Sequence, residues 1–189
     1  RAEADAGRAI APGNITVARL LEEWATKALP NRRGGRLEAS TLGVHRAAIR
    51  ALTGPTARLA SRRIRDLTAD HVDAALERLA AEGKGRSRRT IASYRATLAA
   101  ALDWARRRRW ITINVARDAE LPVSARSAET GRTMTVDEAR AFLAAAEGTR
   151  FAAMWITMLH LGLRPGEAAG LSWQDVDLEA GIVHVARGR

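Results

Sequence analysis

Apolar residues recur at three- and four-residue spacing through much of the first 110 positions, a pattern typical of amphipathic helices around a core. It predicts four helices, beginning at Thr16, near Ser40, at Thr68 and at about Ser87, the last running to about Arg109. The residues expected to face inward are Val17, Leu20, Leu21, Trp24, Ala28, Leu42, Ile49, Leu52, Val72, Ala75, Leu76, Leu79, Ile91, Tyr94, Leu98, Ala101, Leu102 and Ala105. These faces predict a compact bundle of four or five helices.

The pattern changes after residue 114. Residues 115–132 are mostly polar and include Pro122, so we expect an interdomain linker. Thr135 and Glu138 then have the spacing of a capping box, which predicts a helix start. Residues 151–160 are apolar nearly all round, which is typical of a helix buried in a core.

The chain as a whole is predicted to be mainly α. Gly181 precedes a short apolar, β-branched run through Val185, which predicts a single strand near the end. The first residue is arginine rather than methionine, so we expect a piece of a longer protein. The expected organisation is a linker from an upstream segment over 1–13, a helical domain over 14–114, a linker over 115–132 and part of a second domain over 133–189.

Charge is unevenly distributed between the two expected domains. Residues 1–113 carry 23 Lys+Arg against 11 Asp+Glu, whereas the rest of the chain carries 8 against 10. Nearly all of the cations are arginine, since Lys27 and Lys84 are the only lysines. Arginine binds phosphate through two parallel N–H groups, so the helical domain is a candidate for nucleic-acid binding. An arginine-rich proteome would enrich arginine along the whole chain, and the local bias argues against that explanation.

The long predicted helix carries Arg88, Arg95 and Arg106 along one line, with Ala92 and Ala99 close to it. Small residues between the arginines would let a phosphate backbone approach, although an ordinary solvated face explains the stripe equally well. The 83–87 loop superficially resembles a phosphate loop but lacks the full pattern and a preceding strand, so we interpret it as a helix-joining loop near the nucleic acid. The cations expected to contact DNA are Lys84, Arg86, Arg88, Arg89, Arg95, Arg106, Arg46 and Arg50.

One arginine in the second domain is presented by local geometry. Pro165 disfavours the α conformation for Arg164 and suits the first position of a helix, so Arg164 should stand at the helix N-cap. Glu167 falls at the third helical position, from which its carboxylate can reach the backbone N–H of the cap. A cation beside unpaired backbone N–H groups suits an anion such as phosphate. An exposed arginine at an ordinary helix start is the simpler alternative.

The residues around Arg164 carry a family resemblance. Gly-Leu-Arg-Pro-Gly-Glu begins at Gly162, and Gly-Leu-Ser-Trp-Gln-Asp-Val-Asp-Leu begins at Gly170. This stretch closely resembles the first conserved box of the tyrosine recombinases, the phage-integrase family. More loosely, the residues from Arg89 to Ala105 resemble the last helix of an integrase core-binding domain.

The resemblance implies a fold and a function. The helical domain would be a SAM-like core-binding domain, and the second domain would be the first helices and first strand of a catalytic domain. The whole protein would be an integrase of a phage or other mobile element, acting in the bacterial cytoplasm as a tetramer on double-stranded DNA recombination sites. It would cleave and rejoin DNA through a 3′-phosphotyrosine, with Arg164 clamping the scissile phosphate and Glu167 supporting it. No metal, other cofactor or membrane partner is expected.

Most of the chemistry that the family requires is not visible in this sequence. No His-x-x-Arg pair follows the box, and the sole tyrosine, Tyr94, lies on the apolar arc of a helix, where we assign it to packing. We therefore expect these 189 residues alone to bind DNA without cleaving it. Asp175 and Asp177 are interpreted as structural, and His160 as a core histidine.

Two other functions remain open. A non-catalytic DNA-binding regulator derived from a recombinase would share the basic bundle without the nucleophile. A helical scaffold for protein partners is the third possibility, and it predicts DNA binding with little salt dependence or none, whereas phosphate contacts lose affinity steeply with salt.

Overall fold

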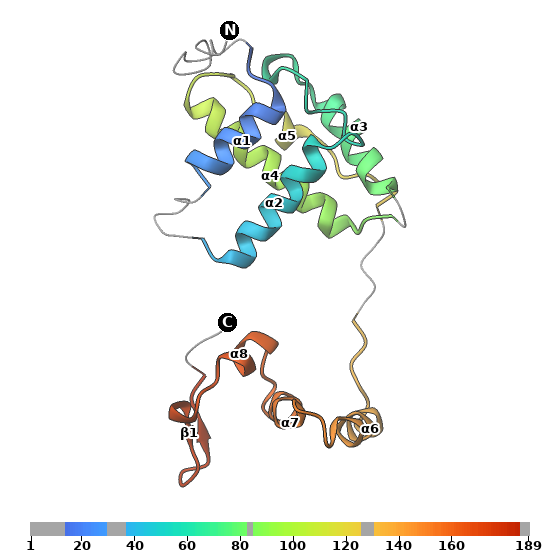
Figure 1. Cartoon of the computed structure of the whole chain (residues 1–189). Helices are drawn as coiled ribbons and strands as arrows, with labels where there is room; N and C mark the ends of the chain where they lie inside the picture. The colour runs from blue at the N-terminus through green and yellow to red at the C-terminus, as the bar shows by residue number, and fades with distance from the viewer. Residues whose placement is uncertain (1–13, 30–36, 83–84, 126–130, 186–189) are drawn as a thin grey trace. The chain divides into compact units, whose positions relative to one another are not determined.

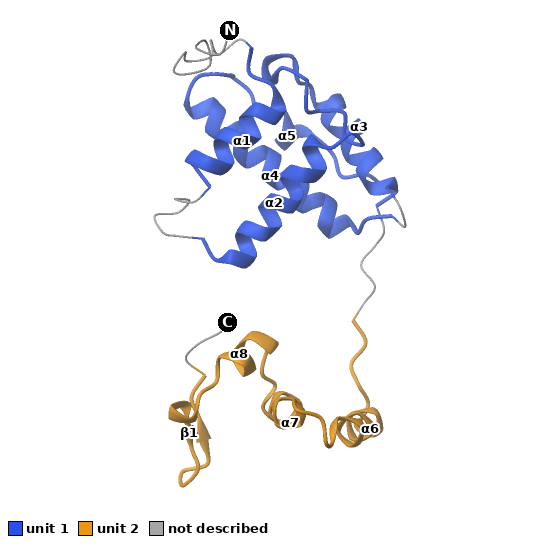
Figure 2. Ribbon diagram, in the orientation of Figure 1, with its two compact units in different colours: residues 1–129 blue, residues 130–189 orange. Residues whose placement is uncertain are grey.

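The computed structural model describes residues 14–29, 37–82, 85–125 and 131–185. It divides into two compact units, residues 1–129 and 130–189, which are coloured separately in Figure 2 and are named here unit 1 and unit 2. None of the helices in these described ranges is long and apolar enough to cross a membrane.

Unit 1 is helical (Figure 1). Its elements are α1 (Val17–Lys27), α2 (Ala39–Thr53), the 3-10 turn η3 (Ile64–Asp66), α3 (Ala69–Ala81), α4 (Arg88–Arg107) and α5 (Val115–Asp118). α4 contacts all four of the other α-helices and carries the centre of the core. Its buried residues are Ile91, Tyr94, Thr97, Leu98, Ala101, Leu102, Trp104 and Ala105. The four predicted helices and most of their inward faces are therefore confirmed.

Hydroxyl side chains cap the N-termini of three of these helices. Thr16 Oγ1 accepts the backbone N–H of Arg19 at 3.3 Å, and Ser87 Oγ accepts that of Thr90 at 3.2 Å. Thr68 accepts from the backbone of His71, whose ring accepts the Thr68 N–H in return. Such caps satisfy N–H groups that have no partner inside the helix, which explains why the predicted starts are correct.

The expected linker over 115–132 is wrong in its first part. α5 lies within it, and Ala116, Ala119 and Ala125 are buried against the core of unit 1. Asn114 caps α5 by accepting the backbone N–H of Ala116 at 3.2 Å. Short segments with isolated alanines carry no periodicity, so their packing depends on partners elsewhere in the chain. The boundary of unit 1 therefore lies beyond residue 125 rather than at 114.

The described residues of unit 2 form three helices and a small hairpin. They are α6 (Val136–Ala146), α7 (Ala152–Leu161), α8 (Pro165–Gly170), the 3-10 turn η4 (Trp173–Asp175), β1 (Val176–Asp177) and β2 (Ile182–Val183). The two strands pair antiparallel, with Val176 opposite Val183. The capping box at the start of α6 is present, since Glu138 Oε2 accepts the Thr135 N–H at 2.8 Å. The predicted α6 start is confirmed. The predicted strand is confirmed over Ile182–Val183, whereas its partner β1 was not predicted.

The prediction that residues 151–160 form a buried helix is only half right. α7 forms, but none of its residues is buried, and Ile156 and Leu161 are 45% and 51% exposed. Only Ala146 and Asp175 are buried among the described residues of unit 2. A helix that is apolar all round needs cover on every side, and the elements described in unit 2 cover only part of it.

Candidate functional site

Arg164 stands at the cap of α8 with the backbone that the sequence predicts. Its φ of −70° and ψ of 151° are extended, and Pro165 occupies the first helical position. Glu167 Oε2 accepts the Arg164 backbone N–H at 2.8 Å, and Glu167 Oε1 accepts Arg164 Nη1 at 2.8 Å. One carboxylate thus fixes both the backbone and the side chain of the arginine.

The turn before Arg164 requires a glycine. Gly162 ends α7 in the left-handed region, with φ of 65°, where side chains with a Cβ are strained. Its N–H and that of Leu163 both donate to the carbonyl oxygen of Met158, the latter at 3.2 Å. This reversal brings the chain directly to the start of α8.

The Arg164 side chain is 84% exposed, whereas that of Glu167 is 25% exposed. The backbone N–H of Arg164, and then its guanidinium, hold the pKa of Glu167 below its ordinary value. The carboxylate is therefore charged at neutral pH and orients the guanidinium without burying it. The remaining N–H groups of Arg164 have no partner among the described residues and face solvent. An oxyanion can bind there, and the geometry resembles a preorganised phosphate clamp.

Two aspartates after α8 shape the chain rather than offer a second site. Asp175 Oδ2 accepts the N–H and the hydroxyl of Ser172, at 2.9 and 2.7 Å. Asp177 Oδ1 accepts the backbone N–H groups of Glu179 and Ala180, at 3.0 and 2.9 Å, in the turn of the hairpin. Their predicted structural role is confirmed.

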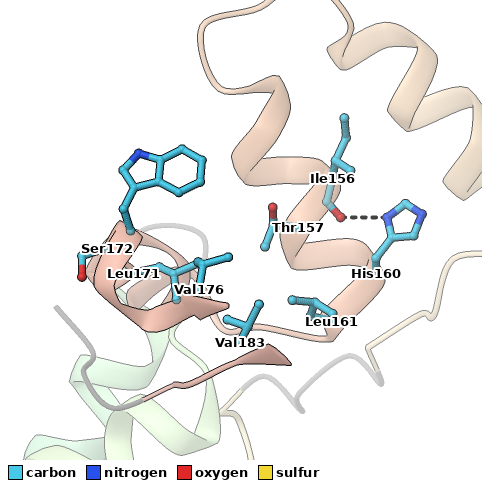
Figure 3. A pocket seen from close by; sticks show the side chains of 9 residues that line it. Ile156, Thr157, His160, Leu161, Leu171, Ser172, Val176 and Val183 are labelled. Carbon is cyan, nitrogen blue, oxygen red and sulfur yellow. Dashed lines mark hydrogen bonds between the residues drawn. The ribbon is translucent and has the colours of Figure 1, made fainter. Parts of the chain in front are cut away.

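The prediction of a core histidine at position 160 is wrong. His160 is exposed, and its Nδ1 lies 2.8 Å from the carbonyl oxygen of Ile156 one turn earlier (Figure 3). The surrounding sequence is apolar, but the elements described in unit 2 do not cover this face of α7.

An apolar hollow lies between α7 and the η4–β1–β2 region (Figure 3). Its volume is about 470 Å³, and it is lined by Ile156, Thr157, His160, Leu161, Leu171, Ser172, Trp173, Val176 and Val183. The side chain of Trp173 is 81% exposed beside it. Arg164 is not among the residues that line this hollow, so the hollow is not part of the candidate phosphate site.

In unit 1, three of the expected DNA-contacting arginines are free. Arg46 and Arg50 are exposed one turn apart on α2, and Arg89 is exposed in the first turn of α4. None of the three has an ion pair or hydrogen bond to the described residues. Their role toward DNA stays a prediction. Lys84, another cation expected to contact DNA, lies outside the described residues.

Arg86 is tied into a polar network instead. It donates to the Tyr94 hydroxyl at 3.1 Å, forms an ion pair with Glu82, and lies over the Tyr94 ring. Glu82 also accepts from the Thr56 hydroxyl at 2.9 Å. The hydrogen bond from Arg86 is the main cause that lowers the pKa of Glu82, so the pair is ionised at neutral pH. Tyr94 itself is buried, 6% exposed, which confirms its packing role.

The arginine stripe of α4 also has protein partners. Arg95 Nη1 donates to the carbonyl oxygen of Ala119 at 2.6 Å, and Arg88 Nη1 to that of Pro122 at 3.4 Å. Arg106 Nε lies 3.7 Å from Asp103. All three arginines of the stripe therefore have a protein partner, and for Arg88 and Arg95 the partner is a backbone carbonyl. These acceptors lie in the stretch expected to be a linker, which is why the sequence did not reveal them.

Asp103 is the centre of a polar network within unit 1 that sequence reasoning missed. Its carboxylate accepts from Asn114 Nδ2 at 2.9 Å and from Arg117 Nη2 at 2.6 Å, and it is 13% exposed. The Arg117 hydrogen bond, with that of Asn114, holds the pKa of Asp103 below its ordinary value. No local motif marks this carboxylate, because its partners come 11 and 14 residues later. Within the described ranges, no group of three or more His, Cys, Asp or Glu side chains could hold a metal ion.

Residues 132–189 match the model of the phage integrase family. An integrase of Streptomyces ambofaciens is 31% identical over 173 residues, which cover 92% of this chain and 42% of the relative. A prophage integrase, IntR, of Escherichia coli strain K12 is 56% identical over 34 residues, 18% of this chain and 8% of that protein. This chain therefore spans less than half the length of the curated relatives it matches.

Two solved structures share the fold. The Tn1549 transposon integrase in complex with a circular intermediate DNA matches with a TM-score of 0.70 at 23% identity, over 87% of this chain and 51% of that one. A lambda integrase tetramer bound to a Holliday junction matches with a TM-score of 0.70 at 22% identity, over 88% of this chain and 45% of that one. The fold is thus that of integrases. The family match over residues 132–189 and the similarity to the Streptomyces relative support a member of the phage integrase family, the tyrosine recombinases.

Proposed function

We propose that this chain is the DNA-binding and phosphate-clamping part of a site-specific tyrosine recombinase that integrates or excises a mobile element. The observation that carries the proposal is Arg164, which is held by Glu167 yet 84% exposed, inside the residues that match the family model. A cation that is fixed and unshielded in this way is suited to the charge that develops on a phosphate during strand transfer.

In this role Arg164 donates to the non-bridging oxygens of the scissile phosphate, and Glu167 keeps the guanidinium in the binding orientation. The attack itself would come from a tyrosine of the whole protein, forming a 3′-phosphotyrosine whose bond energy is kept for rejoining. Tyr94 does not serve, because it is buried in unit 1 and hydrogen-bonded to Arg86.

Unit 1 supplies affinity for the duplex. Arg46, Arg50 and Arg89 are exposed and unpaired among the described residues, so they can bind phosphates without first losing a protein partner. Their guanidinium groups belong to the part of the chain in which Lys+Arg outnumber Asp+Glu, 23 to 11 over residues 1–113. An excess of cations attracts DNA independently of its sequence.

The whole protein would work as a homotetramer on two DNA sites in the bacterial cytoplasm. The lambda integrase match supports the assembly, since that protein is a tetramer on a Holliday junction. Each protomer would contribute one Arg164 clamp to one scissile phosphate.

The DNA-binding part of the proposal is tested by fluorescence anisotropy with duplex DNA. Replacing Arg46, Arg50 and Arg89 together by alanine removes three phosphate contacts, and we expect a loss of affinity of at least tenfold at low salt, on the order of 0.5 kcal/mol or more per contact. Arg19→Ala is the matched control, because Arg19 is already paired with Glu22 and Glu23. Equal affinities of the triple variant and the wild type would contradict the assignment.

The clamp is tested in a longer form of the protein that includes the nucleophile. On a nicked DNA site, Arg164→Ala should abolish the covalent protein–DNA adduct while leaving duplex affinity within about threefold. Glu167→Gln keeps a neutral hydrogen-bond acceptor and should reduce adduct formation less. Adduct formation at the wild-type rate in the Arg164 variant would overturn the assignment.

A further inference from the structure

The stretch that leads out of unit 1, residues 114–125, is held along its length and is called here the exit segment. Its apolar side docks through Ala116, Ala119 and Ala125, which are 0%, 2% and 5% exposed. Its polar side is held by charged groups of two helices, α3 and α4. The backbone N–H of Glu120, for example, donates to Asp73 Oδ1 of α3 at 2.8 Å.

Two arginines of α4 satisfy carbonyl oxygens of this segment. Arg95 Nη1 lies 2.6 Å from the oxygen of Ala119, and Arg88 Nη1 lies 3.4 Å from that of Pro122. Ala119 follows the short helix α5 and is buried, so its carbonyl needs a partner from elsewhere in the chain. The buried Pro122 carbonyl also accepts the backbone N–H of Ala125 at 3.3 Å, so it depends less on Arg88. The shorter contact makes Arg95 the stronger of the two anchors.

We infer that Arg95, assisted by Arg88, is a positioning residue that docks the exit segment, so that the tether to unit 2 begins at Ala125 rather than at Asn114. The greatest length of the tether follows from the residue at which it begins. From Ala125 to Thr135, the cap of α6, the chain reaches at most about 35 Å at roughly 3.5 Å per residue. From Asn114 the limit would be about 70 Å on the same basis. Docking of the exit segment, to which Arg95 contributes, thus halves the greatest length of the tether.

A docked exit segment matters if both units hold one duplex, a consequence that rests on the proposed function. A short tether keeps the second unit at high effective concentration once the first has bound. In this account Arg95 and Arg88 strengthen DNA binding through the protein chain, while Arg89, their exposed neighbour, acts on phosphate directly.

Hydrogen–deuterium exchange of the 189-residue chain without DNA tests the anchor itself. In Arg95→Ala, the amides of residues 119–125 should exchange about tenfold faster, while those of α1 and the middle of α4 keep their protection. Arg88→Ala should show a smaller change, and Arg89→Ala, the matched control, none. Unchanged exchange of residues 119–125 in Arg95→Ala would overturn the inference. If Arg95→Ala unfolds unit 1, the Arg95→Lys variant, which keeps a cation, is used instead. Exchange of residues 119–125 in Arg95→Lys should increase to an intermediate extent. No increase in their exchange would equally overturn the inference.

The salt dependence of DNA binding separates anchoring from phosphate contact. A lost phosphate contact lowers the slope of log K against log salt by about 0.9. We expect that loss for Arg89→Ala and an unchanged slope for Arg95→Ala, whose affinity should nevertheless fall about threefold or more. A reduced slope for Arg95→Ala would overturn the inference in favour of a direct contact. A wild-type chain that binds no DNA would contradict the proposed function, while the exchange experiment would still decide the anchor.

Discussion

Replacing Asp103 by asparagine tests the hydrogen bonds that join α4 to the exit segment. The substitution keeps the shape of the side chain but removes the charge that accepts from Arg117 at 2.6 Å and from Asn114 at 2.9 Å. Asn114 is 6% exposed, so a poorly matched amide pair would be left where water does not compensate. Arg117 is 65% exposed, so solvent screening reduces the contribution of its ion pair with Asp103 to stability.

Hydrogen bonds to a charged group contribute about 1.5–3 kcal/mol each, and screening of Arg117 puts the expected total near the lower end, about 2 kcal/mol. For a domain of this size that loss lowers the melting temperature by about 8 °C. Thermal unfolding followed by circular dichroism measures it, because most helical residues lie in unit 1. Glu77→Gln is the matched control: Glu77 is exposed on α3 and has no partner among the described residues.

The pH dependence of the free energy of unfolding provides an independent check that Asp103 stabilises the fold in its charged form. The Asp103 pKa is lowered in the folded chain, mainly by the Arg117 hydrogen bond, relative to about 3.9 in the unfolded chain. Its contribution to the free energy of unfolding is therefore complete above about pH 4 and is lost as the pH falls through the folded value. The difference in the free energy of unfolding between wild type and Asp103→Asn should be greatest at pH 7 and should decrease in acid. A gap below about 0.5 kcal/mol at pH 7, or one that grows in acid, would refute the reasoning.

Four further changes in stability follow from the backbone and the core, and each is measured by urea unfolding. Leu98→Ala removes a fully buried side chain of α4 and should cost about 2–5 kcal/mol; a cost under 1 kcal/mol would contradict the core assignment. Gly43 lies within α2 with open space around a new methyl group, so Gly43→Ala should stabilise unit 1 by about 0.5–1 kcal/mol. Gly162 has a φ of 65°, so Gly162→Ala should destabilise unit 2 by about 1 kcal/mol. Thr135→Ala removes the cap of α6 and should cost unit 2 about 1 kcal/mol, with no effect on unit 1.

Features that depend on neighbouring residues were predictable from the sequence. The starts at Thr16, Thr68 and Thr135 need only a hydroxyl and the next three backbone N–H groups. The Arg164 cap was predictable for the same reason, because Pro165 restricts its backbone and Glu167 is three residues away.

Features that depend on distant partners were not predictable. Periodicity showed that Arg95 lies on one face of α4, but its acceptor, the Ala119 carbonyl, is 24 residues further along. Likewise, the apolar sequence of α7 indicated a preference for burial but not which elements would cover it. Composition indicates that the surface of a helix is apolar, whereas the elements that cover this surface are determined by tertiary contacts.

The central claim is that this chain binds duplex DNA through phosphates contacted by unit 1, and the slope of log K against log salt tests it most directly. Three phosphate contacts, from Arg46, Arg50 and Arg89, predict a slope of about −2.7 or steeper between 50 and 200 mM salt. The variant lacking all three should lose about 2.7 from the steepness of that slope. A wild-type slope near zero, or an identical slope in the triple variant, would contradict the account.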